Sequence, residues 1–308
     1  SLKAQISEFN YDSLIKIKND EAIEVFKQGK YEIAEKKFLE VLNLKERYFS
    51  KDDIRIANTQ ANLVAIYTNL YKYEDAIKYA EKANDLFYNK KDKYPNNLAT
   101  LLSIQALLYN YVKEFDKSLY YNNQSLRLLE NSDNVGKIKA TIYGNMGQTF
   151  LKQEDYSAAI EYTKKAIKNI SKDDAHNFQL NINLLYPYSL LKEFDNIKIT
   201  LDKIYSYIKN FAPDDTMKLI KYYNAKGSYH FDKSDYKQAL NYWDKADRLA
   251  NSYFVSMNQV QFDGKNNLIR YYFEVEKYTV VLQIVQAVGD DLLQTLAASQ
   301  QQNFRYRK

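Results

Sequence analysis

The amino-acid sequence predicts an all-α protein built as a solenoid of seven helical hairpins. Two observations favour this fold class. Gly and Pro are scarce, at 7 and 3 of 308 residues, which is too few for the many turns of a β-sandwich or barrel. Apolar residues recur at spacings of three and four, as in amphipathic helices, and this pattern itself repeats along the chain.

The clearest unit of the repeat runs from Thr141 to Asn169. A first predicted helix carries an apolar face, and a short polar break over 152–155 separates it from a second helix with its own apolar face. The spacing of these faces therefore predicts one helical hairpin. The residues of the two faces are Tyr143, Met146, Gly147, Phe150, Tyr156, Ala159, Ile160, Thr163, Ala166 and Ile167.

The same signal recurs seven times, as an aromatic residue followed three positions later by a small or aliphatic anchor, just after a polar break. Successive anchors are 42, 42, 41, 38, 42 and 42 residues apart. A nearly fixed period of this length predicts a stack of hairpins. The pairs are Tyr31/Ala34, Tyr73/Ala76, Phe115/Ser118, Tyr156/Ala159, Phe194/Ile197, Tyr236/Ala239 and Tyr278/Val281.

At three further positions, counted from the anchor, each repeat carries mostly residues of the same kind. We expect small residues where two helices cross and aromatic residues beside them, because a small side chain lets two backbones approach closely. Twelve residues before the anchor stand Ala22, Val64, Ala106, Gly147, Leu185, Gly227 and Ile269. Nine before it stand Val25, Tyr67, Tyr109, Phe150, Tyr188, His230 and Tyr272, and seven after it stand Val41, Ala83, Ser125, Ala166, Ile204, Ala246 and Val288.

This pattern resembles the tetratricopeptide repeat (TPR) family, whose hairpins carry an L-G-x-x-Y element followed by an A-x-x-x-F/Y-x-x-A element. The best matches are Met146-Gly147-x-x-Phe150 with Ala159-x-x-x-Thr163-x-x-Ala166, Lys226-Gly227-x-x-His230 with Ala239-x-x-x-Trp243-x-x-Ala246, and Leu63-Val64-x-x-Tyr67 with Ala76-x-x-x-Ala80-x-x-Ala83.

The usual TPR period is about 34 residues, whereas the period here is about 42. The long-period repeats of kinesin light chains and of bacterial peptide-sensing regulators are therefore the closer resemblance. HEAT repeats have a similar period but lack the small/aromatic/small signature.

The resemblance implies a right-handed superhelical solenoid of seven TPR-like hairpins with a C-terminal capping helix. The expected domains are an N-terminal extension over 1–10, the repeat array over 11–289, and a capping helix or a linker to a missing segment over 290–308. Pro187 falls inside the first helix of the fifth repeat, where we expect it to kink the helix. The favoured interpretation is a local bend that packing absorbs, and the alternative is a change in the curvature of the array that divides repeats 1–4 from repeats 6 and 7.

Several function classes find no support in the sequence. The net charge of +5 arises from interleaved basic and acidic residues, so no nucleic-acid partner is expected. The chain has no Cys, and His176 and His230 stand 54 residues apart without metal-ligand spacing. Phosphate loops and hydrolase motifs are also missing. We therefore expect no catalytic residues, no metal site, no cofactor and no enzymatic activity.

The compartment is left open by the sequence. The sequence contains neither an apolar run of membrane-helix length nor a signal-peptide pattern. A cytoplasmic location is favoured, with an extracytoplasmic sensor domain as the alternative. Since the first residue is Ser1 rather than Met, the chain could be a piece of a larger protein, with a membrane segment after Lys308 or an attached output domain elsewhere.

The candidate binding residues lie on the first helices, which line the concave surface of stacked hairpins. Six of seven first helices carry an asparagine at the positions expected to face this groove, although asparagine is a mediocre helix former. Its amide can both donate to and accept from a peptide backbone, as the resemblance to peptide-binding TPR proteins implies. The predicted groove residues are Asn62, Asn145, Gln148, Asn183, Tyr186, Lys221, Asn224, Asn267 and Arg270.

The asparagines could instead form hydrogen bonds between adjacent helices or reflect an Asn-rich composition, and the sequence leaves both possibilities open. We expect a non-catalytic module that binds a peptide or an extended protein segment in the groove, as the sensor or regulatory part of a bacterial signalling protein. The alternative is a scaffold or adaptor that assembles a multiprotein complex.

Overall fold

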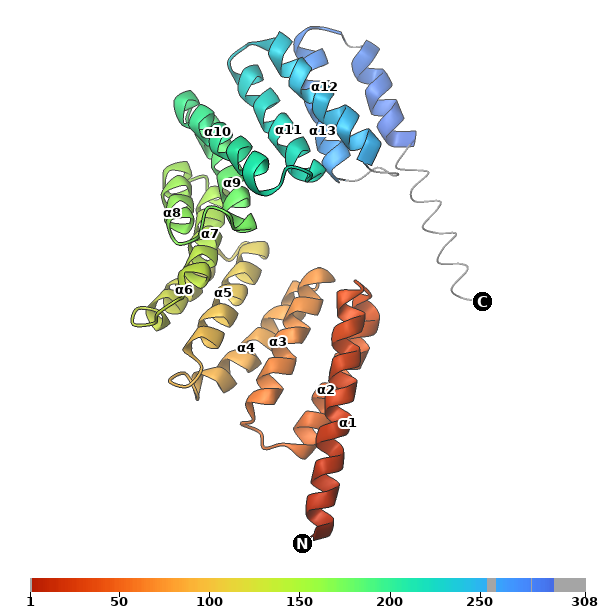
Figure 1. Ribbon diagram of the computed structural model, residues 1–308, viewed down its shortest axis with the longest axis vertical. Helices are drawn as coiled ribbons and strands as arrows, with labels where there is room; N and C mark the ends of the chain where they lie inside the picture. The colour runs from red at the N-terminus through yellow and green to blue at the C-terminus, as the bar shows by residue number, and fades with distance from the viewer. Residues whose placement is uncertain (1, 254–258, 278, 291–308) are drawn as a thin grey trace. The chain divides into compact units, whose positions relative to one another are not determined.

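The computed structural model describes residues 2–253, 259–277 and 279–290, and within these ranges every regular element is an α-helix (Figure 1). Residues 279–290 are helical, and residues 291–308 of the predicted capping helix lie outside the described residues. The named helices are α1 (Leu2–Lys27), α2 (Tyr31–Tyr48), α3 (Ile54–Asn69), α4 (Tyr73–Tyr88), α5 (Pro95–Tyr111), α6 (Phe115–Leu128), α7 (Gly136–Lys152), α8 (Tyr156–Lys168), α9 (Ala175–Leu190), α10 (Phe194–Phe211), α11 (Thr216–Asp232), α12 (Tyr236–Tyr253) and α13 (Gln259–Glu274).

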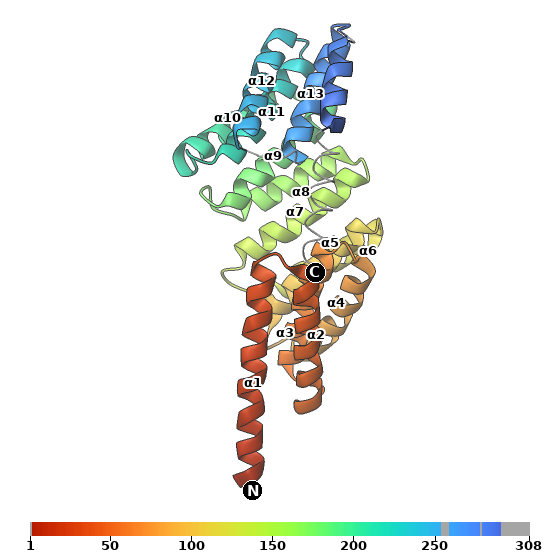
Figure 2. The same cartoon turned by 90° about the vertical axis from the view of Figure 1, so that its right-hand side faces the viewer.

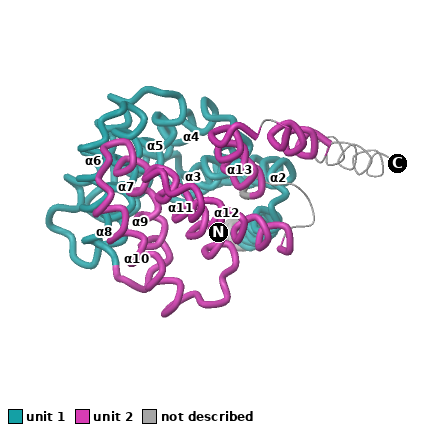
Figure 3. The backbone as a smooth tube through the Cα atoms, turned by 90° about the horizontal axis from the view of Figure 1, so that it is seen from above, with its two compact units in different colours: residues 1–170 teal, residues 171–308 magenta. Residues whose placement is uncertain are grey.

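The chain divides into two compact units, residues 1–170 and residues 171–308 (Figure 3). The boundary falls between α8 and α9, directly before the repeat that contains Pro187. The prediction of an all-α fold is confirmed for the described residues.

Unit 1 is a series of four helical hairpins. Helix α1 packs on α2, α3 on α4, α5 on α6 and α7 on α8, and the second helices α2, α4 and α6 also contact the first helix of the next hairpin (Figures 1 and 2). Helix α1 begins at Leu2, so that residues 2–10, which the sequence set apart as an extension, are continuous with the first helix of repeat 1.

Unit 2 follows the same pattern, with α9 on α10, α11 on α12, and α12 on α13. Helix α9 is continuous through Pro187 to Leu190. The proline has no N–H to donate to the carbonyl of Asn183, but only three residues of the helix follow it, so few bonds are disturbed. The predicted change in curvature at this repeat stays a prediction.

In each of the seven hairpins, the residue five positions before the anchor lies in the turn between the two helices and has a left-handed backbone conformation. The N–H group of the next residue then donates to the carbonyl of the residue nine positions before the anchor, as in Lys72 to Tyr67 at 2.9 Å and Asp235 to His230 at 2.8 Å. This is the Schellman closure of a helix end. The seven left-handed residues are Gly29, Tyr71, Lys113, Glu154, Lys192, Ser234 and Glu276.

The small residues at the helix crossings are needed for space. A Cβ atom added to Gly147 would lie 2.6 Å from the Thr163 hydroxyl oxygen, and one added to Gly227 would lie 2.4 Å from the Trp243 ring. The anchors Ala34, Ala76 and Ala239 are fully buried. The packing roles predicted for these positions are therefore confirmed.

Candidate functional site

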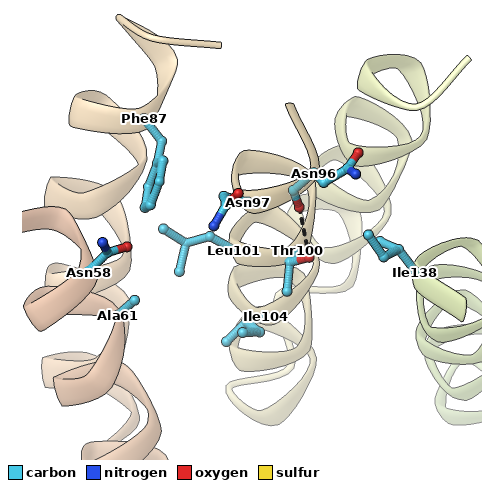
Figure 4. A pocket seen from close by; sticks show the side chains of 9 residues that line it. All are labelled: Asn58, Ala61, Phe87, Asn96, Asn97, Thr100, Leu101, Ile104 and Ile138. Carbon is cyan, nitrogen blue, oxygen red and sulfur yellow. Dashed lines mark hydrogen bonds between the residues drawn. The ribbon is translucent and has the colours of Figure 1, made fainter. Parts of the chain in front are cut away.

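The first helices of unit 1 form the walls of a small cleft. Its cavity of about 340 Å³ lies between α3 and α5, with Ile138 of α7 at one side (Figure 4). Three exposed asparagines, Asn58, Asn96 and Asn97, stand around an apolar floor that includes Leu101. Such a mixture of amide groups and apolar surface suits a peptide, whose backbone is polar and whose side chains are varied.

Sequence reasoning missed these three asparagines, because it counted only two groove positions per helix. A usable signal was present in the sequence. Asn96 and Asn97 directly follow Pro95, which starts α5 and places both residues in the first helical turn. Thr100 closes the turn by donating to the carbonyl of Asn96 at 2.8 Å (Figure 4).

Asn145 on α7 is half-buried and is held by the preceding first helix. Its Nδ2 donates to the Ser103 hydroxyl at 2.9 Å and to the Ser103 carbonyl at 3.3 Å. The amide therefore links α5 to α7, so this asparagine does form a hydrogen bond between adjacent first helices. Its Oδ1 makes no hydrogen bond with a described residue, so that the carbonyl end of a fixed amide is left over as an acceptor.

The other predicted groove residues of unit 1, Asn62 and Gln148, are half-buried. Neither side chain makes a hydrogen bond with another described residue. Near the C-terminal end of α7, Lys152 donates to the carbonyl of Asn110 at 3.2 Å and lies 5.3 Å from the centre of the Tyr111 ring. Burial, reinforced by the charge of Lys113, lowers the pKa of the Lys152 ammonium group.

In unit 2 the predicted residues are linked from one first helix to the next. Lys221 of α11 donates to Gln179 of α9 at 3.2 Å, and Gln179 donates to Asn183 at 2.9 Å. Asn267 of α13 donates to Asn224 of α11 at 3.4 Å. These five side chains form a polar row across the first helices α9, α11 and α13. Since all five are only half-buried, the row presents further donors and acceptors at the surface.

The two remaining predicted residues flank this row. Tyr186 of α9 is 60% exposed. The guanidinium group of Arg270 on α13 lies 3.9 Å from a carboxylate oxygen of Asp232 and 4.8 Å from the centre of the Phe231 ring. Asp232 also accepts a hydrogen bond from Ser189 of α9, so α9, α11 and α13 are joined a second time.

The histidine and carboxylate side chains of the described residues are scattered. Among those residues, no group of three or more His, Cys, Asp or Glu side chains converges as a metal site would require. His230 packs against Tyr242 and lies 3.1 Å from a carboxylate oxygen of Asp235. None of the described helices combines the length and the apolar character that a membrane span requires.

Comparison with known proteins identifies the repeats. A family model described as tetratricopeptide repeat matches residues 97–172, and a second model with the same description matches residues 56–83. No curated protein matches the sequence.

Several solved structures share the fold. The aspartyl phosphate phosphatase F from Bacillus subtilis superimposes with a TM-score of 0.68 at 15% identity, over 94% of this chain and 73% of that one. The apo form of RapI gives 0.66 at 14% identity, over 90% and 99%. A Rap protein complexed with the competence and sporulation factor gives 0.60 at 18% identity, over 89% and 73%. Together with the periodic helix breaks and the small residues at the crossings, these matches show that the chain has the long-period tetratricopeptide repeat fold.

Proposed function

We propose that this protein is a non-catalytic, peptide-binding regulator that holds an extended segment along the faces of its first helices. The observation that carries the proposal is the state of the asparagines. In the Asn267–Asn224 pair and in the contact from Asn145 to Ser103, one end of an amide is fixed by the neighbouring first helix. The other end has no partner among the described residues and is left for a ligand.

Such half-satisfied amides suit a peptide backbone. An extended chain alternates N–H and C=O groups, and an anchored amide offers one matching acceptor or donor without losing side-chain rotamer entropy on binding. A segment bound on unit 1 would place a carboxylate or acidic side chain at Lys152 and apolar side chains in the cleft beside Leu101 and Ile104. A segment bound on unit 2 would place an acidic group at Lys221.

A signalling role is part of the proposal. One similar structure is a Rap protein that holds the competence and sporulation factor, and at 18% identity this likeness shows only a shared fold. A fold of stacked repeats also suits a switch, since each repeat contacts only its neighbours and a ligand that spans several repeats can change their stacking. We propose that the ligand is a peptide signal and that an attached or separate partner supplies the output.

The test begins with the ligand itself. Peptides that co-purify with the full chain are identified by mass spectrometry and resynthesised, and their affinities are measured by titration calorimetry. We expect Asn145→Ala and Asn224→Ala each to weaken binding roughly tenfold, because each removes hydrogen bonding to the backbone of the ligand. Asn210→Ala, on the exposed face of the second helix α10, is the matched control and should leave the affinity unchanged.

Unchanged affinity in both groove variants would refute the role of the asparagines. Co-purification of an intact folded protein, bound with the same affinity by Asn145→Ala and Asn224→Ala, would instead favour the scaffold function.

A further inference from the structure

A second cavity of about 380 Å³ opens between the second helices α4 and α6, and residues of α5 also line it. It shares no lining residue with the cleft on the first helices. We propose that this cavity, here called the α4–α6 pocket, binds an arginine side chain of a partner protein. The proposal is independent of the peptide site on the first helices.

The pocket has a negative lining. Glu81 and Asp85 are one turn apart on α4, so both carboxylates lie on the same face of the helix. Glu81 accepts a hydrogen bond from the Tyr109 hydroxyl at 3.1 Å, whereas the Asp85 carboxylate makes no ion pair or hydrogen bond with a described residue. No Lys or Arg is among the lining residues, so these charges are not neutralised within the pocket.

Aromatic rings stand on both walls. Tyr88 of α4 is 60% exposed and Tyr120 of α6 is 57% exposed. The Tyr88 ring already attracts a cation, since the ammonium group of Lys91 lies 4.9 Å from its centre. Exposed tyrosines beside carboxylates favour a flat cation that can stack on a ring while it donates hydrogen bonds.

A buried amide at the inner end of the pocket lacks a donor. Asn84 is only 8% exposed, and its Nδ2 donates to Gln105 Oε1. Its Oδ1 has no hydrogen-bond partner among the described residues. Since an unsatisfied buried acceptor is costly, a donor that entered the pocket would gain a hydrogen bond that water at the surface does not supply.

Arginine meets all three requirements at once. Its guanidinium group is planar, has five N–H donors and no acceptor, and binds carboxylates through paired hydrogen bonds. It would lie between the tyrosine rings, donate to Asp85 and Glu81, and reach Asn84 Oδ1. The ammonium group of lysine is compact and cannot stack in this way, so we infer a preference for arginine.

The test uses the full chain and three small probes: N-acetyl-arginine amide, N-acetyl-lysine amide and N-acetyl-citrulline amide. Citrulline has nearly the shape of arginine but no charge. Binding is followed by NMR of the tyrosine rings at millimolar probe concentrations. We expect arginine to bind roughly tenfold more tightly than citrulline, and more tightly than lysine, with an affinity that falls as salt is added.

Variants locate the site. Asp85→Asn and Tyr120→Ala should each weaken arginine binding about tenfold. Asp75→Asn, an exposed carboxylate at the start of the same helix, should have no effect. Equal binding of arginine and citrulline would overturn the proposal, as would unchanged binding by Asp85→Asn or no binding at all. Neither substitution removes an intramolecular hydrogen bond found in the structure, so a folding defect does not stand in for a binding defect.

Discussion

Repeats 3 and 6 have the same architecture, but the second helix buries polar side chains in repeat 3 and apolar side chains in repeat 6. In α12 of repeat 6, the three packing positions hold Ala239, Trp243 and Ala246, and all are buried. In α6 of repeat 3, the equivalent positions hold three polar residues, and these are its only buried ones. They are Ser118, Asn122 and Ser125.

The two interiors are filled in different ways. The Trp243 ring occupies the space left by Gly227 across the hairpin, and its Nε1 donates to the carbonyl of Asn224 at 3.1 Å. In repeat 3, Ser118 shares a hydrogen bond with Thr149 at 3.0 Å, but neither amide atom of Asn122 has a described partner.

The hairpin geometry is therefore compatible with both interiors, although they should contribute very differently to stability. Buried apolar area and close packing stabilise repeat 6, whereas repeat 3 carries the cost of unsatisfied polar groups.

Removal of the Trp243 side chain should have the largest effect. Trp243→Ala leaves a cavity at a fully buried site and deletes one hydrogen bond, so we expect the free energy of unfolding to fall by about 3–5 kcal/mol in urea titrations. Lys237→Ala, at an exposed position of the same helix, should change it by less than about 0.5 kcal/mol. A Trp243→Ala loss as small as that of the control would show that repeat 6 is not closely packed.

Two glycines on the first helices of unit 2 form a matched pair for the next prediction. Gly227→Ala forces a methyl group against the Trp243 ring and should destabilise the protein by about 1–3 kcal/mol. A Cβ atom at Gly264 meets nothing within 4 Å, so Gly264→Ala should stabilise helix α13 by about 0.5–1 kcal/mol. Urea titrations of both variants measure the two changes, and shifts of the same sign would contradict the packing explanation.

A pH-dependent difference is expected from Tyr109, which occupies in repeat 3 the position of His230 in repeat 6. Burial, and then the hydrogen bond to Glu81, raise the pKa of the Tyr109 phenol. A raised folded-state pKa gives stability that is present below the unfolded pKa of 10.0 and is lost as the pH rises above it. Between pH 9 and pH 11 this group alone should remove about 1.4 kcal/mol.

Tyr109→Phe should abolish that part of the alkaline loss, as measured by urea unfolding at the two pH values. An identical pH dependence of Tyr109→Phe and the unsubstituted chain would refute the assignment.

The smallest effect should have the opposite sign. Asn122→Leu removes a buried amide without described partners and keeps a side chain of similar shape, so we expect stabilisation by about 1 kcal/mol in urea unfolding. Asn123→Leu is the control, since the adjacent side chain is exposed and should change stability by less than about 0.5 kcal/mol. If Asn122→Leu destabilises the protein, the amide has a partner that stabilises repeat 3.

Much of the fold could be predicted from the sequence, because it depends on local spacing. The polar breaks, the anchors and the small residues at the crossings all recur at fixed distances along the chain, and the structure places a left-handed turn residue five positions before each anchor. Glycine was a poor guide to these turns, since only Gly29 is a glycine among the seven.

The candidate sites were harder to predict. The groove register puts Asn224 and Asn267 on neighbouring first helices, yet nothing in the sequence says that one amide bonds the other or that Asn145 bonds Ser103. Those bonds join residues about 42 positions apart and depend on how far each helix is rotated toward the next. The α4–α6 pocket draws on three helices and has no motif of its own.

The hairpin, its length and its repetition are thus encoded in local sequence spacing, since they follow from periodic burial of apolar side chains within about 42 residues. Tertiary packing determines which polar side chains form hydrogen bonds between helices and which keep a donor or acceptor without a partner among the described residues. The outcome depends on differences of a few tenths of an ångström in the donor–acceptor distance between side chains of separate helices, because a hydrogen bond forms only within a narrow range of distances.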